Sequence, residues 1–289
     1  MVVYNPRAVL DGNAPGPWGP SVAITYTKRD VLLYAVGIGA RDLRFVYEGH
    51  PGFAVFPTFP IRWGATGLVV DETALPPTPG PLTIDAERHL EVLGPLPLEG
   101  TVEVRSRLVS VHPRGKGNAF VEIESEVSDA GRPCVRMVTG VFRRGVEKLG
   151  DIEPFEGAGE SRSVRLPMPD RKPDVEVSAR IADNQAHVYR LSGDYNPLHI
   201  DPDAARFGGF EAPILHGLCT LGHSADMLLG ALAGGDPARF SKLKVRFSSP
   251  VFPGDELGLR AWRESPTRVV FDVRARDKTV ISDAFFEFK

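Results

Sequence analysis

Apolar and polar residues alternate in several short stretches of the chain. This period is typical of β-strands that bury one face. Turn sequences such as Asp129-Ala130-Gly131 separate neighbouring stretches. The predicted strands form two groups, one at 101–111, 119–127 and 135–143 and one at 242–247, 256–262, 269–274 and 280–288. The pattern therefore predicts two antiparallel sheets.

One longer segment, which begins at Pro213, is apolar round most of a helical circumference. Its apolar positions are Leu215, Leu218, Cys219, Leu221, Ala225, Leu228, Leu229 and Leu232. A helix of this kind is buried inside a fold. The opening Pro-Ile-Leu-His-Gly fits a first helical turn, where backbone N–H groups lack intrahelical partners and the helix dipole favours negative charge.

The chain contains a degenerate internal repeat. Leu33-Tyr34 matches Val188-Tyr189, residues 60–64 match 213–217, and residues 97–100 are similar to 252–254, at offsets of 155, 153 and about 154. Each copy consists of a helix followed by an antiparallel sheet, which is the α+β order. Residues 146–175, rich in Gly, Pro and charge, indicate a linker. The predicted domains are 1–150, the linker 151–175, and 176–289.

Composition adds general limits. With 289 residues, of which 42% are hydrophobic and 25% charged, the chain has the composition of a globular protein. A formal charge of −3 gives no general attraction to nucleic acid or anionic membranes, so we expect neither as a partner. Cys134 and Cys219 do not have metal-ligand spacing, which indicates reduced thiols. No signal-peptide core and no peroxisomal Ser-Lys-Leu terminus occur, so the expected location is the bacterial cytoplasm.

The residues most suggestive of chemistry lie just before the apolar helix. Asp194, Asn196 and His199 fall within six residues, and Gly193 and Pro197 constrain the loop that carries them. A carboxylate beside an imidazole is the usual requirement for acid–base chemistry on water. The structural alternative is an Asx-turn with a hydrogen-bonded histidine.

The helix start that follows strengthens the catalytic interpretation. Gly217 lacks a side chain, so a substrate oxygen can approach the backbone N–H groups of the first turn. An acid–base loop followed by an oxyanion-binding helix start indicates an active site.

The run G-D-Y-N-P-L-H at 193–199 and H-G-L-C at 216–219 resemble the hydratase 2 family, the MaoC-like (R)-specific enoyl-CoA hydratases. The resemblance is to the double hot-dog form, similar to the hydratase part of peroxisomal multifunctional enzyme type 2. It implies two hot-dog units in one chain. It also implies that Asp194 and His199 activate a water molecule, that Asn196 helps to hold the site, and that the Gly217 amide polarises the thioester carbonyl.

The first copy has Gly37-Ile38-Gly39-Ala40-Arg41-Asp42-Leu43 in place of this motif, with no histidine. One active site per chain, in the second copy, is the natural inference. In two-unit family members such a first copy is associated with a wider acyl pocket. The apolar residues expected to shape that pocket are Val36, Ile38, Phe53 and Phe56.

Positive charges for the CoA phosphates are harder to assign. Lys242, Lys244 and Arg246 alternate on one face of a predicted strand, where a solvated outer face explains them equally well. Arg114 and Lys116 lie in a Gly-rich turn with the same two interpretations. Arg246 is the predicted CoA contact.

Other kinds of site fit the residues less well. A calcium loop beginning at Asp194 has His199 at its sixth position and Ala205 at its twelfth, where Gly and Glu are usual. His199, His216 and His223 lack the helical spacing of a zinc site, so His216 and His223 are interpreted as packing locally. Neither a metal nor another cofactor is expected, and a serine hydrolase motif is absent from the sequence.

The predicted function is the reversible hydration of a trans-2-enoyl-CoA to a (R)-3-hydroxyacyl-CoA, with medium, long or bulky acyl chains. The expected binding partner is the CoA thioester, and the expected oligomer is a homodimer. A 3-hydroxyacyl-ACP dehydratase of fatty-acid or polyketide synthesis is the nearest alternative. A thioesterase on the same fold and a non-catalytic acyl-CoA-binding subunit are further alternatives. The intact motif of the second copy favours an enzyme.

Overall fold

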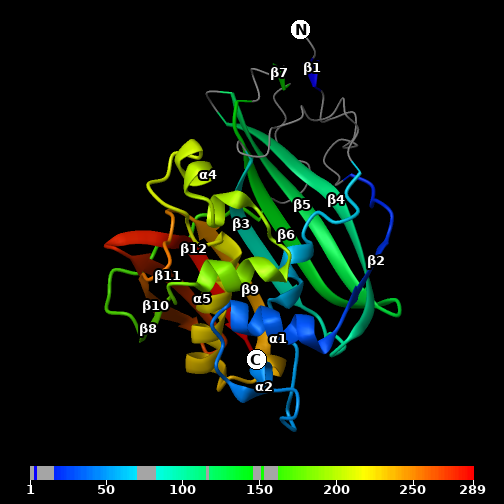
Figure 1. Ribbon diagram of the computed structural model, residues 1–289, viewed down its shortest axis with the longest axis vertical. Coiled ribbons are helices and arrows are strands. Elements are labelled where there is room, and N and C mark those ends of the chain that lie inside the picture. The colour runs from blue at the N-terminus through cyan, green and yellow to red at the C-terminus, as the bar shows by residue number, and fades with distance from the viewer. Residues whose placement is uncertain (1–2, 5–15, 70–82, 115–116, 146–150, 153–161) are drawn as a thin grey trace. The chain divides into compact units, whose positions relative to one another are not determined.

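The computed structural model describes residues 3–4, 16–69, 83–114, 117–145, 151–152 and 162–289 (Figure 1). Two compact units are assembled from separate segments of the chain. Unit 1 contains Met1–Ile24, Trp63–His89 and Val102–Val164, and unit 2 contains Thr25–Arg62, Leu90–Thr101 and Arg165–Lys289. The units thus follow contacts between segments, whereas the predicted domains 1–150 and 176–289 follow the order of the sequence.

Unit 1 is built on long antiparallel strands. They are β4 (Gly100–Arg114), β5 (Asn118–Asp129) and β6 (Arg132–Arg143), which pair in that order, with β3 (Thr83–Val92) next to β6. The predicted strands 101–111, 119–127 and 135–143 are confirmed. Ala130 and Gly131, both with positive φ, form the turn between β5 and β6. The short strands β1 (Val3–Tyr4) and β7 (Asp151–Ile152) pair in parallel, and β2 (Val22–Tyr26) runs from unit 1 into unit 2.

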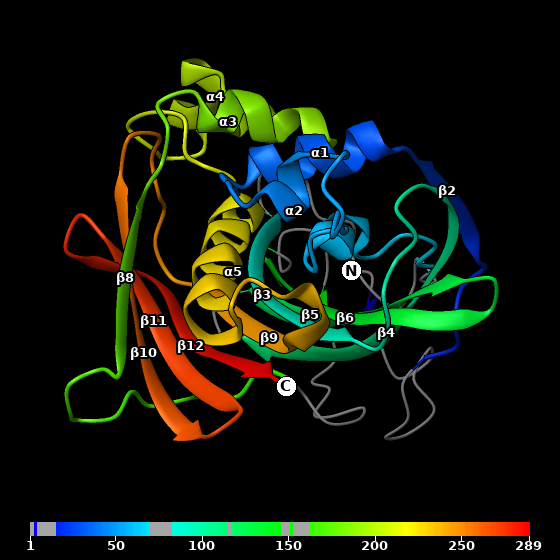
Figure 2. The ribbon, with the colours of Figure 1, turned by 90° about the horizontal axis from the view of Figure 1, so that it is seen from below.

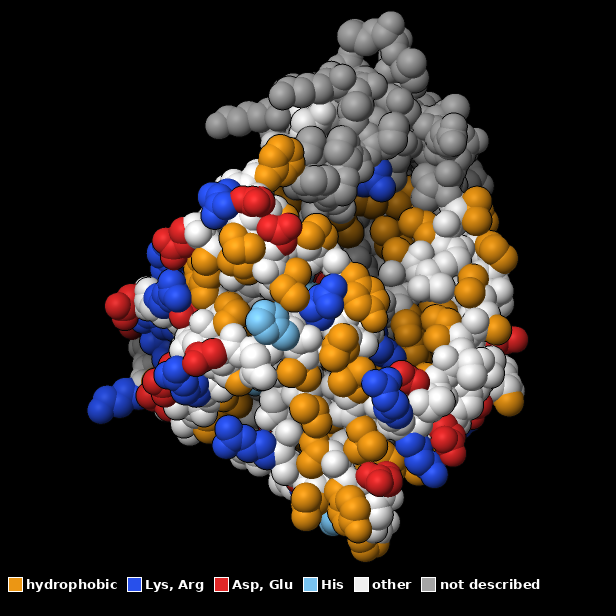
Figure 3. Space-filling model, in the orientation of Figure 1, with side chains coloured by type: hydrophobic (Ala, Val, Ile, Leu, Met, Phe, Trp, Pro, Cys, Tyr) orange, Lys and Arg blue, Asp and Glu red, His pale blue; other side chains and the backbone are white. Residues whose placement is uncertain are grey.

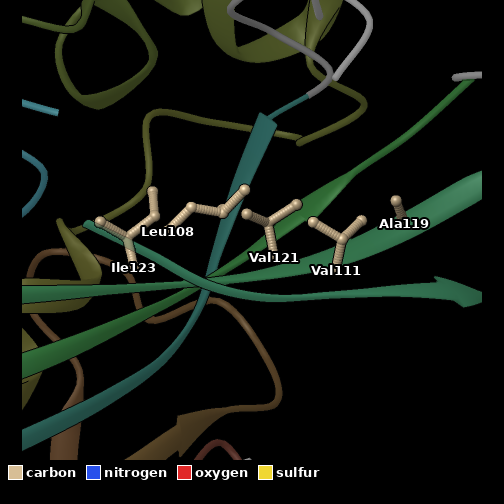
Figure 4. Packing of buried hydrophobic residues seen from close by; sticks show 5 residues of the cluster. All are labelled: Leu108, Val111, Ala119, Val121 and Ile123. Atoms are coloured by element: carbon tan, nitrogen blue, oxygen red, sulfur yellow. The ribbon is translucent and has the colours of Figure 1, made fainter. Parts of the chain in front are cut away.

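A row of apolar side chains covers one face of this sheet (Figure 4). Its members are Leu108, Val111, Ala119, Val121 and Ile123. Leu108 pairs with Ile123, and Val111 pairs with Val121. Leu108 and Val111 are three residues apart on β4, whereas Ile123 and Val121 are two residues apart on β5. A bulge between Leu108 and Ser110 accounts for the extra residue and returns β4 to the register that keeps both side chains on the buried face.

Unit 2 contains five further strands of the same ten-stranded sheet, where the pattern predicted two sheets. Its strands are β8 (Val175–Arg180), β9 (Phe240–Phe247), β10 (Glu256–Ser265), β11 (Arg268–Ala275) and β12 (Lys278–Phe288). They pair antiparallel in the order β9-β12-β11-β10-β8. All four strands predicted between 242 and 288 are confirmed, and β8 was not predicted. Leu166 and Met168, from the predicted linker, pack against Trp262, Val270 and Phe285 of this sheet.

The predicted apolar helix is α5 (Gly217–Ala233), and the strands of unit 2 curve round it (Figure 2). It contacts β8, β9 and β12. Residues on every side of the helix are buried, among them Cys219, Leu221, Ala225, Leu228 and Leu232. This burial confirms the predicted internal helix.

Short helices of unit 2 carry the loops around α5. In the first copy these are α1 (Lys28–Gly37), α2 (Leu43–Val46) and η2 (Phe59–Trp63). In the second copy they are α3 (Gln185–Tyr189), η5 (Arg190–Ser192), η6 (Pro197–His199), α4 (Pro202–Phe207) and η7 (Pro237–Arg239). Helix α1 contacts α3 and η5, and this contact explains why residues 25–62 belong to unit 2.

Charged side chains of both signs are interspersed on the visible face of the described residues (Figure 3). This distribution agrees with the small net charge. Among the described helices, none has both the length and the apolar character needed to cross a membrane.

Candidate active site

The predicted acid–base loop follows the helical segment α3–η5. Gly193 turns the chain with a φ of 116°, a conformation that L side chains rarely adopt, although a Cβ there would meet nothing within 4 Å. The backbone amide of Asn196 donates to Asp194 Oδ1 at 3.2 Å. The side-chain oxygen of Asn196, Oδ1, accepts from the backbone amide of Leu198 at 3.0 Å and caps η6. The Asx-turn that was the structural alternative is thus present, and it holds Asp194, Asn196 and His199 in a defined loop.

The His199 ring is buried and oriented by one hydrogen bond. Its Nδ1 lies 2.9 Å from the Ile214 carbonyl oxygen. Because a carbonyl only accepts, Nδ1 carries the hydrogen and Nε2 presents a lone pair. Burial lowers the pKa of His199, while the Ile214 carbonyl and the Asp194 carboxylate act in the opposite direction. His199 is therefore neutral at pH 7 and its Nε2 is able to accept a proton.

A second histidine, His216, belongs to the same cluster. Its ring stacks on that of His199, with centroids 3.7 Å apart and planes at 27°, and its Nε2 donates to the Asp194 carbonyl oxygen at 3.3 Å. Burial, followed by the neighbouring His199, lowers the pKa of His216 to about 4. The interpretation of His216 as a locally packed residue is correct, but the ring on which it packs is the predicted catalytic one. Sequence spacing alone gave no sign of this contact.

Asp194, His199 and His216 each offer one metal-ligand atom, and these atoms lie within 4.8 Å of one another. In the described part of the chain this is the group that could hold a metal ion. His199 Nδ1 is bonded to the Ile214 carbonyl and His216 Nε2 to the Asp194 carbonyl, so one nitrogen of each ring is already used. The geometry suits acid–base chemistry better than a tetrahedral metal site. The expectation that no metal is needed stays a prediction.

Gly217 is the first residue of α5, as predicted. The Cys219 and Thr220 amides both donate to the His216 carbonyl at 3.1 Å, so the helical bonds begin there and the amide of Gly217 lies at the positive end of the helix. A Cβ at residue 217 would lie 3.5 Å from the Phe247 ring, which is ordinary contact. An alanine would therefore fit at this position without a clash.

A cavity of about 530 Å³ opens beside His199. Its other lining residues are Ala186, His187, Ile200, Glu211, Ala212, Pro213, Phe252, Pro253 and Arg276. The volume falls in the range of small-molecule sites. The cavity therefore joins the acid–base loop to a space that can hold part of a ligand.

The cation beside this cavity is Arg276, whose position sequence reasoning missed. Its Nε donates to Asp255 Oδ1 at 2.5 Å, and its Nη1 lies 3.4 Å from Glu211 Oε1. The predicted CoA contact, Arg246, does not line the cavity and lies 3.9 Å from Asp283. Its neighbour Lys244 is buried and donates to the Asp283 carbonyl at 2.7 Å, so the solvated outer face suggested for this strand is wrong for Lys244.

The residues predicted to shape the acyl pocket lie in the first-copy segment of unit 2, and none of them lines the cavity. Ile38 and Phe56 are fully buried, Phe53 is half-buried and Val36 is exposed. Ile38 packs directly on α5, since a Cβ on Gly222 would lie 2.3 Å from Ile38 Cγ2. Ile38 thus contacts the helix that starts at Gly217, and the role of the four residues stays a prediction.

Models of two protein families match the two halves of this sequence. The MaoC like domain matches residues 165–284, and the MFE-2 hydratase 2 N-terminal domain matches residues 24–145. The first match includes the acid–base loop and α5. The second includes the copy that lacks the motif.

Two curated relatives are similar over most of this chain. It is 37% identical to the peroxisomal multifunctional enzyme type 2 of Drosophila melanogaster, over 92% of this chain and 46% of that protein. It is 36% identical to the probable enoyl-CoA hydratase 2 of Dictyostelium discoideum, over 85% of this chain and 84% of that protein. The chain spans about half the length of the first relative and most of the second.

Solved structures agree with these matches. A MaoC-like dehydratase from Phytophthora capsici is 34% identical, with a TM-score of 0.85 and 97% of each chain covered. A Mycobacterium tuberculosis protein described as a double hot-dog fold is 13% identical, with a TM-score of 0.55 over 93% of this chain and 95% of that chain, and shows the fold alone. The predicted α+β class, with two hot-dog units in one chain, is confirmed.

Proposed function

The chain belongs to the MaoC-like hydratase 2 family, and from this premise we propose that it hydrates trans-2-enoyl-CoA reversibly to (R)-3-hydroxyacyl-CoA. The observation that carries the proposal is the loop of Asp194 and His199 beside the first turn of α5. His199 Nδ1 is occupied by Ile214, which leaves Nε2 to face the reacting water. Family membership supplies the (R) configuration.

The proposed step requires two proton transfers. As the water oxygen bonds to Cβ, one group of the Asp194–His199 pair accepts a water proton and the other delivers a proton to Cα. The proton taken from the water is matched by the proton given to Cα, so the pair ends the reaction in the protonation state in which it began. Because the two groups interact, the proton belongs to the pair and not to one residue.

The remaining groups support this transfer. The Gly217 amide donates to the thioester oxygen as negative charge develops there, which lowers the barrier because the donor is already in place. Asn196 fixes the loop through its hydrogen bond with Leu198. The cavity beside His199 holds part of the CoA thioester, with Arg276 as its positive side chain and Arg246 as a more distant candidate.

Substrate choice is the finer part of the proposal. Medium, long or bulky acyl chains are proposed because Ile38 packs on α5 and belongs to an apolar first-copy segment that also contains Phe53 and Phe56. The cytoplasmic location and the homodimer stay predictions, and the Drosophila relative is named as a peroxisomal enzyme. Neither a metal nor another cofactor is proposed, since the acid–base pair and the amide account for the reaction.

The test uses crotonyl-CoA, decenoyl-CoA and a bulky enoyl-CoA, together with the matching acyl carrier protein thioesters. Hydration is followed by loss of enoyl absorbance, and chiral analysis identifies the product. The proposal expects turnover of CoA thioesters and an (R) product. An (S) product, no turnover, or a strong preference for carrier-protein thioesters would overturn it, and the last result would favour the dehydratase alternative.

A further inference from the structure

An arginine of the first copy lies in a place where the second copy has leucine. In the repeat, Arg62 of Pro60-Ile61-Arg62-Trp63-Gly64 matches Leu215 of Pro213-Ile214-Leu215-His216-Gly217. Leu215 is buried, as expected for an apolar residue. Burial of a cation costs free energy unless it is bonded. The partners of Arg62 therefore show what this substitution achieves.

Arg62 reaches the end of the helical segment that leads to the acid–base loop. Its Nη1 donates to the carbonyl oxygen of Ser192 at 2.5 Å. The guanidinium carbon lies 4.2 Å from the centroid of the Phe59 ring and 5.9 Å from that of Tyr34. Cation–π contact of this kind favours a charged group at a site with little water. Burial lowers the pKa of Arg62, but arginine stays charged in proteins.

Ser192 is the last residue of η5, and Gly193 and Asp194 follow it directly. Carbonyl groups at the end of a helical segment lack intrahelical partners, and a cation there is favourable. The bond from Arg62 therefore fixes the point at which the chain leaves the helix. Gly193 is flexible, so the direction of the Asp194 side chain depends on how firmly Ser192 is held.

The other end of the same segment is also attached to the first copy. The buried side-chain amide of Gln185 donates to the carbonyl oxygens of Val36, at 3.2 Å, and Gly37, at 2.5 Å, at the end of α1. A Cβ on Gly37 would lie 3.4 Å from Tyr189 Cα, so the two helices are in close backbone contact. The α3–η5 segment is thus held at its start by Gln185 and at its end by Arg62.

We propose that Arg62 is a positioning residue for the acid–base loop, through which the first copy takes part in the chemistry of the second. The inference rests on the proposed hydratase function. Arg62 acts on Asp194 through the Ser192 carbonyl and the backbone of Gly193, and it does not contact the substrate. Loss of its bond misplaces the carboxylate relative to His199 and leaves the binding cavity unchanged.

The experiment compares Arg62→Met, which keeps an unbranched apolar stem and removes the charged guanidinium, with Arg62→Lys. The matched control is Arg44→Met, because Arg44 is also a first-copy arginine that caps a helix end, with Nη2 3.1 Å from the Gly234 carbonyl at the end of α5. Both Met variants are expected to lower Tm. Only Arg62→Met should lower kcat, on the order of 10- to 100-fold, since small misplacements of reacting groups have effects of that size.

Three further readouts separate positioning from general stability. KM of Arg62→Met should stay within about threefold of the original. Arg62→Lys should recover part of kcat, because an ammonium can still donate to Ser192. The pH profile of kcat/KM should shift in Arg62→Met and not in Arg44→Met, because the coupling between Asp194 and His199 depends on their distance.

The outcomes decide separately on the two proposals. Absence of hydratase activity in the original protein overturns the proposed function. An active original protein with equal kcat in Arg62→Met and Arg44→Met, or with an unshifted pH profile in Arg62→Met, overturns the positioning role. If Arg62→Met does not fold, Arg62→Gln replaces it. Equal kcat and equal KM in Arg62→Gln and Arg62→Lys would then overturn the inference.

Discussion

Replacement of Asp226 by asparagine should stabilise the protein at neutral pH. Asp226 lies on α5, where burial and then the neighbouring Asp42 raise its pKa to about 6, while Arg41 acts in the opposite direction. The ordinary value is 3.8. At pH 7 the Asp226 carboxylate is charged, and this charged form is less stable in the folded protein than in the unfolded chain, where water solvates it. One pKa unit corresponds to about 1.4 kcal/mol, so the shift of about two units sets an upper bound of about 3 kcal/mol.

The gain should depend on pH in a defined direction. As pH falls below about 6, the folded protein takes up the Asp226 proton before the unfolded chain does, so the original protein recovers the lost stability. The advantage of Asp226→Asn should therefore shrink between pH 7 and pH 4. Burial lowers the pKa of His216 and His223 to about 4, which costs stability as pH falls from 6.5 to 4. That loss is common to both proteins and cancels in their difference.

The assay is urea unfolding of the original protein and of Asp226→Asn at pH 7.5 and pH 4.5. Asp170→Asn is the control, because Asp170 is exposed and its replacement should change stability little at either pH. A stabilisation of about 1–3 kcal/mol at pH 7.5 that fades at pH 4.5 is expected. Equal stability at pH 7.5, or a gain that persists unchanged at pH 4.5, would refute the reasoning.

Further predictions concern catalysis and packing. Asp194→Asn and His199→Gln should each lower kcat by about 10²-fold or more in folded protein, and near-original turnover in either would remove that residue from the mechanism. Gly217→Ala fits without a clash, so it should keep the Tm yet lower kcat by up to about 10²-fold, as measured by steady-state kinetics. Ile38→Ala should cost about 2–5 kcal/mol of unfolding free energy, whereas the exposed Val36→Ala should cost little, and equal losses would contradict the packing of Ile38 on α5.

Sequence patterns predicted the sheets and the central helix because their periods are local. The alternation in 119–127 is recognised by comparing residues two positions apart. The helix after Pro213 is recognised from the apolar residues of that segment alone. Strand β8 was missed although Val175–Arg180 alternates apolar and polar residues. Strand β8 is short and lies next to the predicted linker, and its pairing with β10 depends on contacts with distant residues.

Lys244 shows where local alternation fails in the sheet itself. The pattern placed it with Lys242 and Arg246 on one strand face, and a solvated face was a fair expectation. In the structure Asp283 has a φ of 47° and lies within an irregularity between Ser282 and Phe285 of β12. Its carbonyl accepts from Lys244 at 2.7 Å, which makes the burial of the ammonium group possible. A bulge on another strand cannot be inferred from the residues around Lys244.

The candidate site divides in the same way. The motif placed Asp194, Asn196 and His199 on one loop and Gly217 at a helix start because those features are contiguous. His216 was part of the quoted H-G-L-C motif, but its stacking on His199 depends on the fold of the loop and could not be inferred from the sequence. Arg276 beside the cavity comes from a distant part of the chain and carried no signal of its own.

The two copies differ in their residues at the acid–base loop, and the first copy has a structural role that does not require catalytic residues. Its loop at 37–43 has no histidine, yet α1 accepts two hydrogen bonds from Gln185, and Arg62 donates to Ser192. A copy kept only as a cover for apolar surface would need apolar residues at these points, as the second copy has at Leu215. The half-buried Arg62 instead pairs the carbonyl at the end of η5, two residues before Asp194. The first copy therefore lacks the histidine of the motif but supplies hydrogen bonds to the segment that leads to the acid–base loop of the second.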